Sequence, residues 1–128
     1  MSTLIESVVA VLKAHDIEHQ LDTDGNIEIS LVGKSITITS EFEDDYLKLN
    51  ACIHTPIAPD NTRKAYKLIR MLNDTHTNCF YLDPLNLVNM EYGMFTSEDT
   101  LMVSQFLRLY NDFSATLNQV EKQVCELS

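Results

Sequence analysis

The chain has 128 residues, a length that fits one domain spanning residues 1–128 and that can bury a core without a metal or a disulfide. Its net charge of −10 is spread over both halves of the sequence. This charge argues against nucleic acid and anionic membranes as partners, because both would repel an acidic surface.

The first predicted element is an amphipathic helix. Apolar residues recur at helical spacing over 4–12. Thr3 can cap this helix, with Glu6 at the spacing of a capping box. His15 and Asp16 end it.

Three short segments with alternating apolar and polar residues follow, near 26–31, 35–39 and 47–53. Such a period of two is typical of strands with one buried face. The connections between them are short, one with Gly33 and one with the acidic run 41–45. Neighbouring strands must therefore be antiparallel and form a meander.

A second helix and a hairpin are predicted next. Asp60 can cap a helix over 61–74, whose apolar residues are spaced i, i+3, i+4, i+7. Two alternating segments then flank the turn "DPLN" at 83–86, which is the pattern of a β-hairpin. We expect four hairpin side chains to face the helices: Phe80, Leu82, Met90 and Tyr92.

The last predicted element is a long helix over about 98–125, capped by Thr96 or Ser97, with Glu98 and Asp99 in its first turn. At about 40 Å it would overhang a small domain, so we expect its far end to pack on a second subunit or to fray. Its apolar stripe consists of Met102, Phe106, Leu109, Phe113, Val120 and Val124.

Together these elements have the order α-β-β-β-α-β-β-α. The predicted fold class is α+β, a single domain with a five-stranded antiparallel sheet and helices packed on it. A sheet that is covered by helices on one face leaves its other face half open to a partner.

No motif in the sequence predicts catalysis, cofactor binding or metal binding. "DTDGN" at 22–26 departs from a calcium loop because its glycine comes too early, and a turn is the simpler interpretation. His15 with His19, and Cys52 with His54, offer two metal ligands each, which do not make a site. There is no nucleophile elbow, P-loop or GxGxxG sequence. We therefore predict no catalytic residue, no cofactor and no metal.

The cysteines and the apolar runs indicate the compartment. Cys52, Cys79 and Cys125 are far apart and odd in number, which is not a disulfide framework, and we interpret Cys79 and Cys125 as structural thiols. The N-terminus shows no secretory signal pattern, and no apolar run is long enough for a membrane helix. We expect a cytoplasmic protein.

The exposed surface is the expected place of function. The acidic run 41–45 is either a solvated hairpin tip or a docking point for a basic peptide. Pairing of two copies as a homodimer and binding of a partner's extended segment against the sheet both remain open. The candidate partner-binding residues are Val32, Tyr46, Cys52, Cys79 and Tyr81 on the sheet, Tyr66 and Met71 on the helix of 61–74, and Glu41, Glu43, Asp44 and Asp45 in the acidic run.

Two stretches carry a resemblance to known proteins: "LIRMLNDTHTNCFYLDPLNLVNMEYGMF" from Leu68 to Phe95, and "TSEDTLMVSQFLRLYNDF" from Thr96 to Phe113. With the element order, the length and the acidic pI, they resemble the class I type III secretion chaperone fold. Within that fold the sequence is similar to the YbjN family of bacterial proteins, candidate sensory transduction regulators. The resemblance covers nearly the whole chain.

The resemblance implies a non-enzymatic module that binds other proteins and forms a homodimer. Secretion chaperones of this fold hold an effector's extended segment along the exterior of their subunits, whereas YbjN-type proteins are implicated in regulation. The sequence does not separate a chaperone from a regulator. The alternative function is a small-ligand sensor with a pocket between the sheet and the helices. An enzyme is the third possibility, and the resemblance transfers no catalytic residue.

Overall fold

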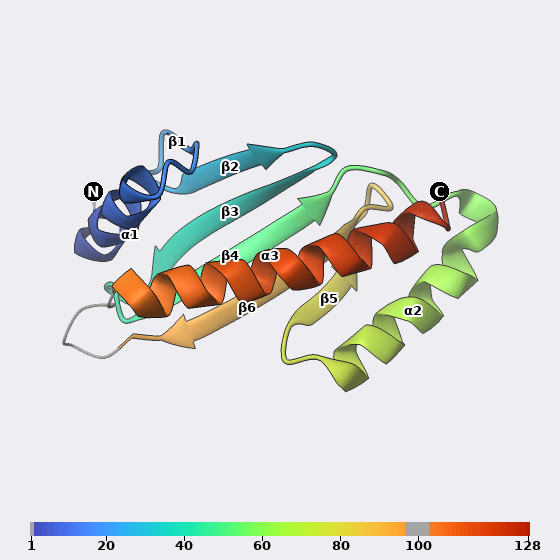
Figure 1. The fold of residues 1–128 in the computed structure, drawn as a ribbon. Helices are drawn as coiled ribbons and strands as arrows, with labels where there is room; N and C mark the ends of the chain where they lie inside the picture. Colours follow the sequence, from blue (N-terminus) through green and yellow to red (C-terminus); the bar gives the residue numbers. More distant parts are fainter. Residues whose placement is uncertain (1, 97–102) are drawn as a thin grey trace.

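The computed structural model describes residues 2–96 and 103–128, and it has an α+β fold (Figure 1). The described helices are α1 (Thr3–Ala14), α2 (Thr62–Thr75), α3 (Val103–Cys125) and the 3-10 turn η1 (Pro59–Asn61). The strands are β1 (Gln20–Leu21), β2 (Ile27–Leu31), β3 (Lys34–Glu41), β4 (Tyr46–Ile53), β5 (Cys79–Leu82) and β6 (Val88–Phe95). The predicted order of helices and strands is confirmed, with one addition.

The described strands form a single antiparallel sheet of six strands rather than the predicted five, in the order β1-β2-β3-β4-β6-β5. The additional strand is β1, in which Gln20 pairs with Glu28 and Leu21 pairs with Ile27. The sequence does not indicate this strand, because two residues are too short to show an alternating pattern. The meander of β2, β3 and β4 and the hairpin of β5 and β6 are as predicted.

The hairpins at the two edges of the sheet have the same type of five-residue loop. The loop begins at Asp22 in the β1–β2 hairpin and at Asp83 in the β5–β6 hairpin. In each loop the aspartate Oδ1 accepts hydrogen bonds from the N–H groups two and four residues later, at 2.9–3.0 Å. The fourth loop residue has a left-handed backbone, with φ of 83° at Gly25 and 62° at Asn86. The prediction that "DTDGN" makes a turn is therefore confirmed.

The cap of α1 differs from the predicted capping box. Ser2 has an extended backbone, and its Oγ accepts a hydrogen bond from the N–H of Ile5 at 3.0 Å, so Ser2 is the cap. Thr3 is instead the first helical residue, and its N–H donates to Asp44 Oδ2 at 3.2 Å. The helix ends before His15, as predicted.

The start of α2 also differs from the prediction, because Asp60 lies in η1 and does not cap the helix. Asn61 is the residue at the cap position, but its side chain makes no hydrogen bond to the first turn of α2. Instead its Nδ2 donates to the backbone carbonyl of Leu127 at 3.1 Å. The N–H of Ala58 donates to the same carbonyl at 3.0 Å. These bonds attach the C-terminus to the segment before α2.

Helix α3 lies across the sheet in front of β4 and β6 (Figure 1). It is helical as far as Cys125, so its far end is not frayed, while packing of that end on a second subunit stays a prediction. Its 23 residues span about 35 Å. Val124, near the far end, is fully buried. Of the predicted caps, Thr96 bonds to the β3–β4 loop instead, and Ser97 lies outside the described residues, as do Glu98, Asp99 and Met102.

The core lies between the helices and one face of the sheet. Phe80 and Met90 are buried, and Leu82 and Tyr92 are partly buried against the core, which confirms their predicted orientation. The buried stripe of α3 contains two residues that the prediction omitted, Tyr110 and Leu117, while Leu109 is half-buried. The stripe is Phe106, Tyr110, Phe113, Leu117, Val120 and Val124.

The outer edge of β5 is closed by a side chain of α2. Asn73 Oδ1 accepts a hydrogen bond from the N–H of Phe80 at 2.7 Å, and Asn73 Nδ2 donates to the Phe80 carbonyl at 3.0 Å. The amide thus replaces the hydrogen bonds that a neighbouring strand would make. Such a closed edge discourages pairing with a foreign strand.

Candidate functional site

The sheet face opposite the core, which we call the open face, is mostly polar. Strand pairing places Thr37, Asn50 and Glu91 side by side in one row of this face. Asn50 Nδ2 donates to the Tyr81 hydroxyl at 2.8 Å and lies 3.4 Å from Glu91 Oε2. These side chains leave little apolar area in the middle of the open face, where Thr39 Oγ1 is buried without a hydrogen-bond partner among the described residues. Apolar side chains are exposed at the end of the face next to the β3–β4 loop.

At that end three aromatic side chains form an exposed cluster, which we call the aromatic tip: Phe42, Tyr46 and Phe95. The ring centroids are 5.7 Å apart for Phe42 and Tyr46, 6.2 Å for Phe42 and Phe95, and 5.0 Å for Tyr46 and Phe95. Phe42 is 65% exposed and Phe95 is 72% exposed. A group of neighbouring aromatic rings that are exposed to water is typical of a contact surface.

The loop between β3 and β4 holds the aromatic tip in an unusual backbone conformation. Phe42, Glu43 and Asp44 all have left-handed backbones, with φ of 53°, 55° and 72°. This region is unfavourable for residues other than glycine. Hydrogen bonds from Thr96 offset the cost, because its N–H donates to the Asp45 carbonyl at 2.8 Å and its hydroxyl to the Asp44 carbonyl at 3.0 Å.

Gly93 provides the space in which Tyr46 lies. A Cβ atom at Gly93 would overlap the phenol ring and hydroxyl of Tyr46. Gly93 does not have a left-handed backbone, so the requirement here is space and not backbone freedom. A glycine inside a strand often marks such a close approach, and this was the available sequence signal for the tip.

The carboxylates of the acidic run 41–45 have different surroundings. Asp44 accepts a hydrogen bond from the first N–H of α1, where the helix dipole favours a negative charge. Glu43 and Asp45 remain exposed beside the aromatic tip. Glu41 pairs with Lys48 at 3.0 Å. The Glu41 hydrogen bond is the largest influence on Lys48 and, with nearby negative charge, raises its pKa although burial lowers it.

The predicted partner-binding residues lie in several separate places. Tyr46 and the acidic run meet at the aromatic tip, and Tyr81 belongs to the polar network of the open face. Val32 is 93% exposed in the turn between β2 and β3, beside a hollow against α3. Tyr66 and Met71 are exposed on α2. Phe42 and Phe95 were not predicted, because Phe42 lies within a polar run and Phe95 lies at the end of a strand.

The cysteines differ in their surroundings. Burial, as the larger cause, and the carboxylate of Asp83 raise the pKa of the Cys52 thiol, which disfavours the reactive thiolate. Cys79 and Cys125 are exposed, and none of the three is in a disulfide. Residues 2–96 and 103–128 contain no group of three His, Cys, Asp or Glu side chains placed to hold a metal ion.

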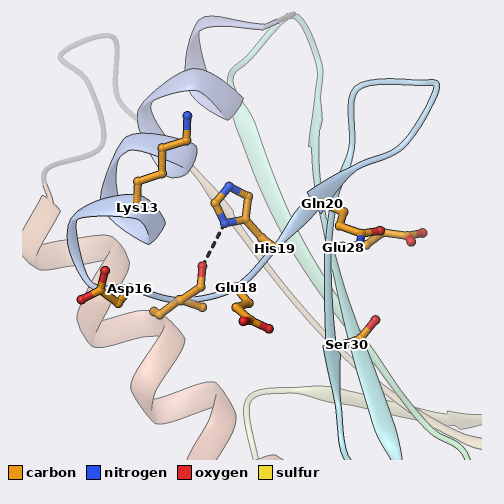
Figure 2. A pocket seen from close by; sticks show the side chains of 8 residues that line it. Lys13, Asp16, Glu18, His19, Gln20, Glu28 and Ser30 are labelled. Carbon is orange, nitrogen blue, oxygen red and sulfur yellow. Dashed lines mark hydrogen bonds between the residues drawn. The ribbon is translucent and has the colours of Figure 1, made fainter.

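The largest of the described hollows, about 590 Å³, lies beside the short strand β1 and is drawn in Figure 2. His19 Nδ1 donates to the carbonyl of Ile17 at 2.9 Å, since a carbonyl can only accept, so Nε2 is the free ring nitrogen. Most of the lining side chains are exposed and of mixed charge. They are Lys13, Asp16, Ile17, Glu18, His19, Gln20, Glu28 and Ser30.

Two further hollows, of about 370 and 400 Å³, lie beside α2 and α3 and share His76. The space directly between the sheet and α3 is filled by buried apolar side chains. Because most side chains that line the β1 hollow are exposed, a ligand there would remain in contact with water.

Among the described helices none is long and apolar enough to cross a membrane.

The comparisons with known proteins give the fold. No family model matches the sequence, and no curated protein matches it either. The crystal structure of YbjN from E. coli, described as a candidate transcription regulator, superposes with a TM-score of 0.73. The match covers 91% of this chain and 87% of that chain at 10% sequence identity. The chain therefore has a YbjN-like α+β fold.

Proposed function

We propose that the protein is a non-enzymatic regulatory module that binds other proteins through the aromatic tip. The observation that carries this proposal is the exposure of Phe42 and Phe95 next to Tyr46 on a backbone that is costly to form. Exposed aromatic rings and left-handed residues are each unfavourable in isolation. Their coincidence at one loop supports a binding role.

The chemistry of the aromatic tip favours a partner segment that is rich in arginine or lysine. The faces of aromatic rings attract cations, and each such contact contributes roughly 0.5–2 kcal/mol. Glu43 and Asp45 lie in the same loop as Phe42 and add negative charge. A segment with alternating cationic and apolar side chains would satisfy both parts of this surface.

The regulatory part of the proposal draws on the fold. The E. coli protein with the same fold is described as a candidate transcription regulator. A net charge of −10 disfavours direct contact with DNA, so we infer that regulation proceeds through protein contacts in the cytoplasm. A chaperone role, in which the bound segment belongs to a client protein, uses the same surface.

Protein binding is favoured over the two other functions. Ser35 Oγ lies 3.1 Å from His54 Nε2 at an exposed position, but among the described residues no third group is hydrogen-bonded to the other ring nitrogen of His54, so the usual arrangement of a catalytic site is incomplete. The β1 hollow is lined mostly by exposed side chains, whereas small-ligand sites bury most of the ligand. No cofactor is needed for the proposed function.

The test uses a display library of random peptides against the immobilised protein. We expect enrichment of sequences rich in arginine and lysine, and loss of their binding by at least tenfold in the double variant Phe42→Ser/Phe95→Ser. The matched control is Leu85→Ser, which removes an apolar side chain that is 75% exposed in the β5–β6 loop, away from the tip. Enrichment that is insensitive to the tip variant, or equal loss in the control, would contradict the proposal.

A further inference from the structure

The outward face of helix α2 is cationic on an acidic protein. Arg63, Lys64, Lys67 and Arg70, which we call the cationic ridge, are all exposed and are four of the nine Lys and Arg residues in the chain. The chain without these four positive charges carries −14, since its net charge is −10. None of the four is in an ion pair within the described ranges 2–96 and 103–128. The ridge therefore offers positive charge that an acidic partner can neutralise.

The spacing of the ridge directs it away from the core. Arg63, Lys67 and Arg70 are separated by four and three positions, so they share one face of the helix. The buried residues Ala65 and Ile69 each follow a member of this row by two positions, which is about 200° round a helix. The row is thus on the opposite side of α2 from the side chains that pack on the sheet.

The cations of the ridge are placed against the helix dipole. The N-terminus of a helix favours acidic side chains, and the C-terminus favours basic ones. The first turn of α2 instead holds Arg63 and Lys64 with no acidic residue, and the last turn has no basic residue. Helix stability therefore does not explain the ridge. Solubility does not explain it either, because cations reduce the net charge that keeps an acidic protein soluble.

Two apolar side chains flank the row of cations. Tyr66 is 59% exposed and Met71 is 45% exposed. Tyr66 precedes Lys67 by one position and Met71 follows Arg70 by one position, so they lie on the two sides of the row. Tyrosine, methionine and arginine are among the side chains that are enriched in protein interfaces. The composition of this face therefore fits contact with another protein.

The small size of the ridge favours a short acidic segment over a nucleic acid or a membrane. Arg63 and Arg70 are about 10 Å apart along the helix axis. A DNA duplex or an anionic membrane presents negative charge over a much larger surface and would also meet the acidic remainder of the molecule. Screening limits charge repulsion to about 8 Å at physiological salt. A few carboxylates that are confined to the ridge are therefore attracted to it.

We propose that the outward face of α2 binds an acidic segment of a partner protein. Carboxylates of the segment pair with Arg63, Lys67 and Arg70, and a neighbouring apolar side chain contacts Tyr66 or Met71. In Figure 1 the β3–β4 loop is at the end of the molecule near α1, and α2 lies at the other end. This surface is separate from the aromatic tip and selects the opposite charge, so the inference goes beyond the proposed function and does not rest on it.

The experiment measures binding of fluorescently labelled synthetic peptides by anisotropy at physiological ionic strength. One peptide consists of glutamates with two phenylalanines, and its matched control has glutamine in place of each glutamate. We expect saturable binding of the acidic peptide alone. The variant Lys67→Glu/Arg70→Glu should weaken this binding at least tenfold, because it places like charges together. Amide shifts in NMR spectra of the wild-type complex should map to 62–75.

Two control variants separate the ridge from net charge and from the aromatic tip. Lys13→Glu/Arg108→Glu reverses two exposed cations outside α2 and changes the net charge by the same amount. Phe42→Ser/Phe95→Ser removes two rings of the tip. Both are expected to bind the acidic peptide within twofold of the wild type. An equal loss in either control would overturn the assignment to α2, as would the absence of saturable binding.

A second variant, Arg63→Glu/Lys64→Glu, distinguishes a binding role from a structural one. Acidic residues in the first turn of α2 complement the helix dipole, so we expect a higher midpoint of thermal unfolding together with weaker peptide binding. A lower midpoint would mean that these cations serve the fold and would overturn the inference. A DNA duplex or phosphatidylserine vesicles that bind more tightly than the peptide, with the same dependence on Lys67 and Arg70, would overturn the choice of a protein partner.

Discussion

Tyr46 and Gly93 show how one small residue positions the aromatic tip. The pair lies on neighbouring strands, and the phenol ring of Tyr46 occupies the volume that a side chain at Gly93 would need. Tyr46 in turn contacts both Phe42 and Phe95. A change at a residue that makes no side-chain contact of its own can therefore disturb the whole surface.

We expect Gly93→Ala to lower the free energy of unfolding by about 1–3 kcal/mol, because the added methyl group overlaps the Tyr46 ring. In the Tyr46→Ala background the same substitution should cost much less, since the space is then empty. Chemical denaturation of the four proteins of this double-mutant cycle measures the coupling. The control is Gly25→Ala, whose cost comes from its left-handed backbone and should not change with Tyr46. Additive effects at Gly93 and Tyr46 would contradict the assignment.

The carboxylate of Asp83, in the β5–β6 loop, makes the stability of the protein depend on pH. Desolvation is the largest single influence and raises its pKa, but hydrogen bonds from the Leu87 N–H, the Asn89 side chain and the Leu85 N–H together lower the pKa below 3.8. A carboxylate with a lowered folded pKa stabilises the protein above its unfolded pKa. This contribution is lost as the pH falls through the lowered value.

We therefore expect Asp83→Asn to lower the free energy of unfolding at pH 7, with the difference from wild type shrinking below about pH 4. Urea denaturation across pH 2–7 is the measurement. Asp60→Asn is the control, because Asp60 is exposed and its carboxylate has no hydrogen bond among the described residues. A difference that does not depend on pH would show that charge is not the source of the effect.

At the scale of elements, three polar side chains supply hydrogen bonds to backbone groups at the ends and edges of neighbouring elements. Asp44 from the β3–β4 loop bonds to the first turn of α1, and Asn61 before α2 bonds to the carbonyl of Leu127. Asn73 of α2 satisfies both backbone groups of Phe80 at the edge of β5. These contacts fix the helices relative to the sheet beyond what apolar burial alone specifies.

We expect Asn73→Ala to lower the free energy of unfolding by about 1–3 kcal/mol, because it leaves the N–H and carbonyl of Phe80 without their partner. Hydrogen exchange should show faster exchange at the Phe80 amide, and the open edge should favour aggregation. Asp74→Ala, at the neighbouring exposed position, is the matched control. Unchanged protection at Phe80 would mean that water or another group replaces the amide.

At the scale of the whole molecule, α3 joins the parts of the fold. Its stripe packs into the same core as α1, α2 and the buried face of the sheet. Leu117, at the middle of the stripe, is fully buried. The C-terminal residues then bond to the segment before α2, so the last helix connects distant parts of the chain.

We expect Leu117→Ala to lower the free energy of unfolding by about 2–5 kcal/mol, the usual range for a cavity in a close-packed core. Leu85→Ala should cost far less, because Leu85 is 75% exposed. Thermal and denaturant unfolding of both variants measure the difference. Equal effects would place Leu117 outside the core.

The sequence by itself determined the order of the elements and the buried face of most of them. Periods of two and of 3.6 residues report which side chains are buried, and this local signal was sufficient for β2 to β6 and for the three helices. It also suggested an interaction surface near Tyr46 and the acidic run. Capping positions were less certain, because Ser2 and Thr3 carry nearly the same local signal.

Only the tertiary structure decided the strand β1, the closed edge at Asn73 and the aromatic tip. Phe42 and Phe95 are 53 positions apart, and they meet because the pairing of β4 with β6 sets Tyr46 opposite Phe95. The positions of the aromatic tip and of α2 at opposite ends likewise depend on the path of the chain through the sheet. A local pattern shows whether a residue is buried, but it does not carry the register and the connections that bring distant residues together.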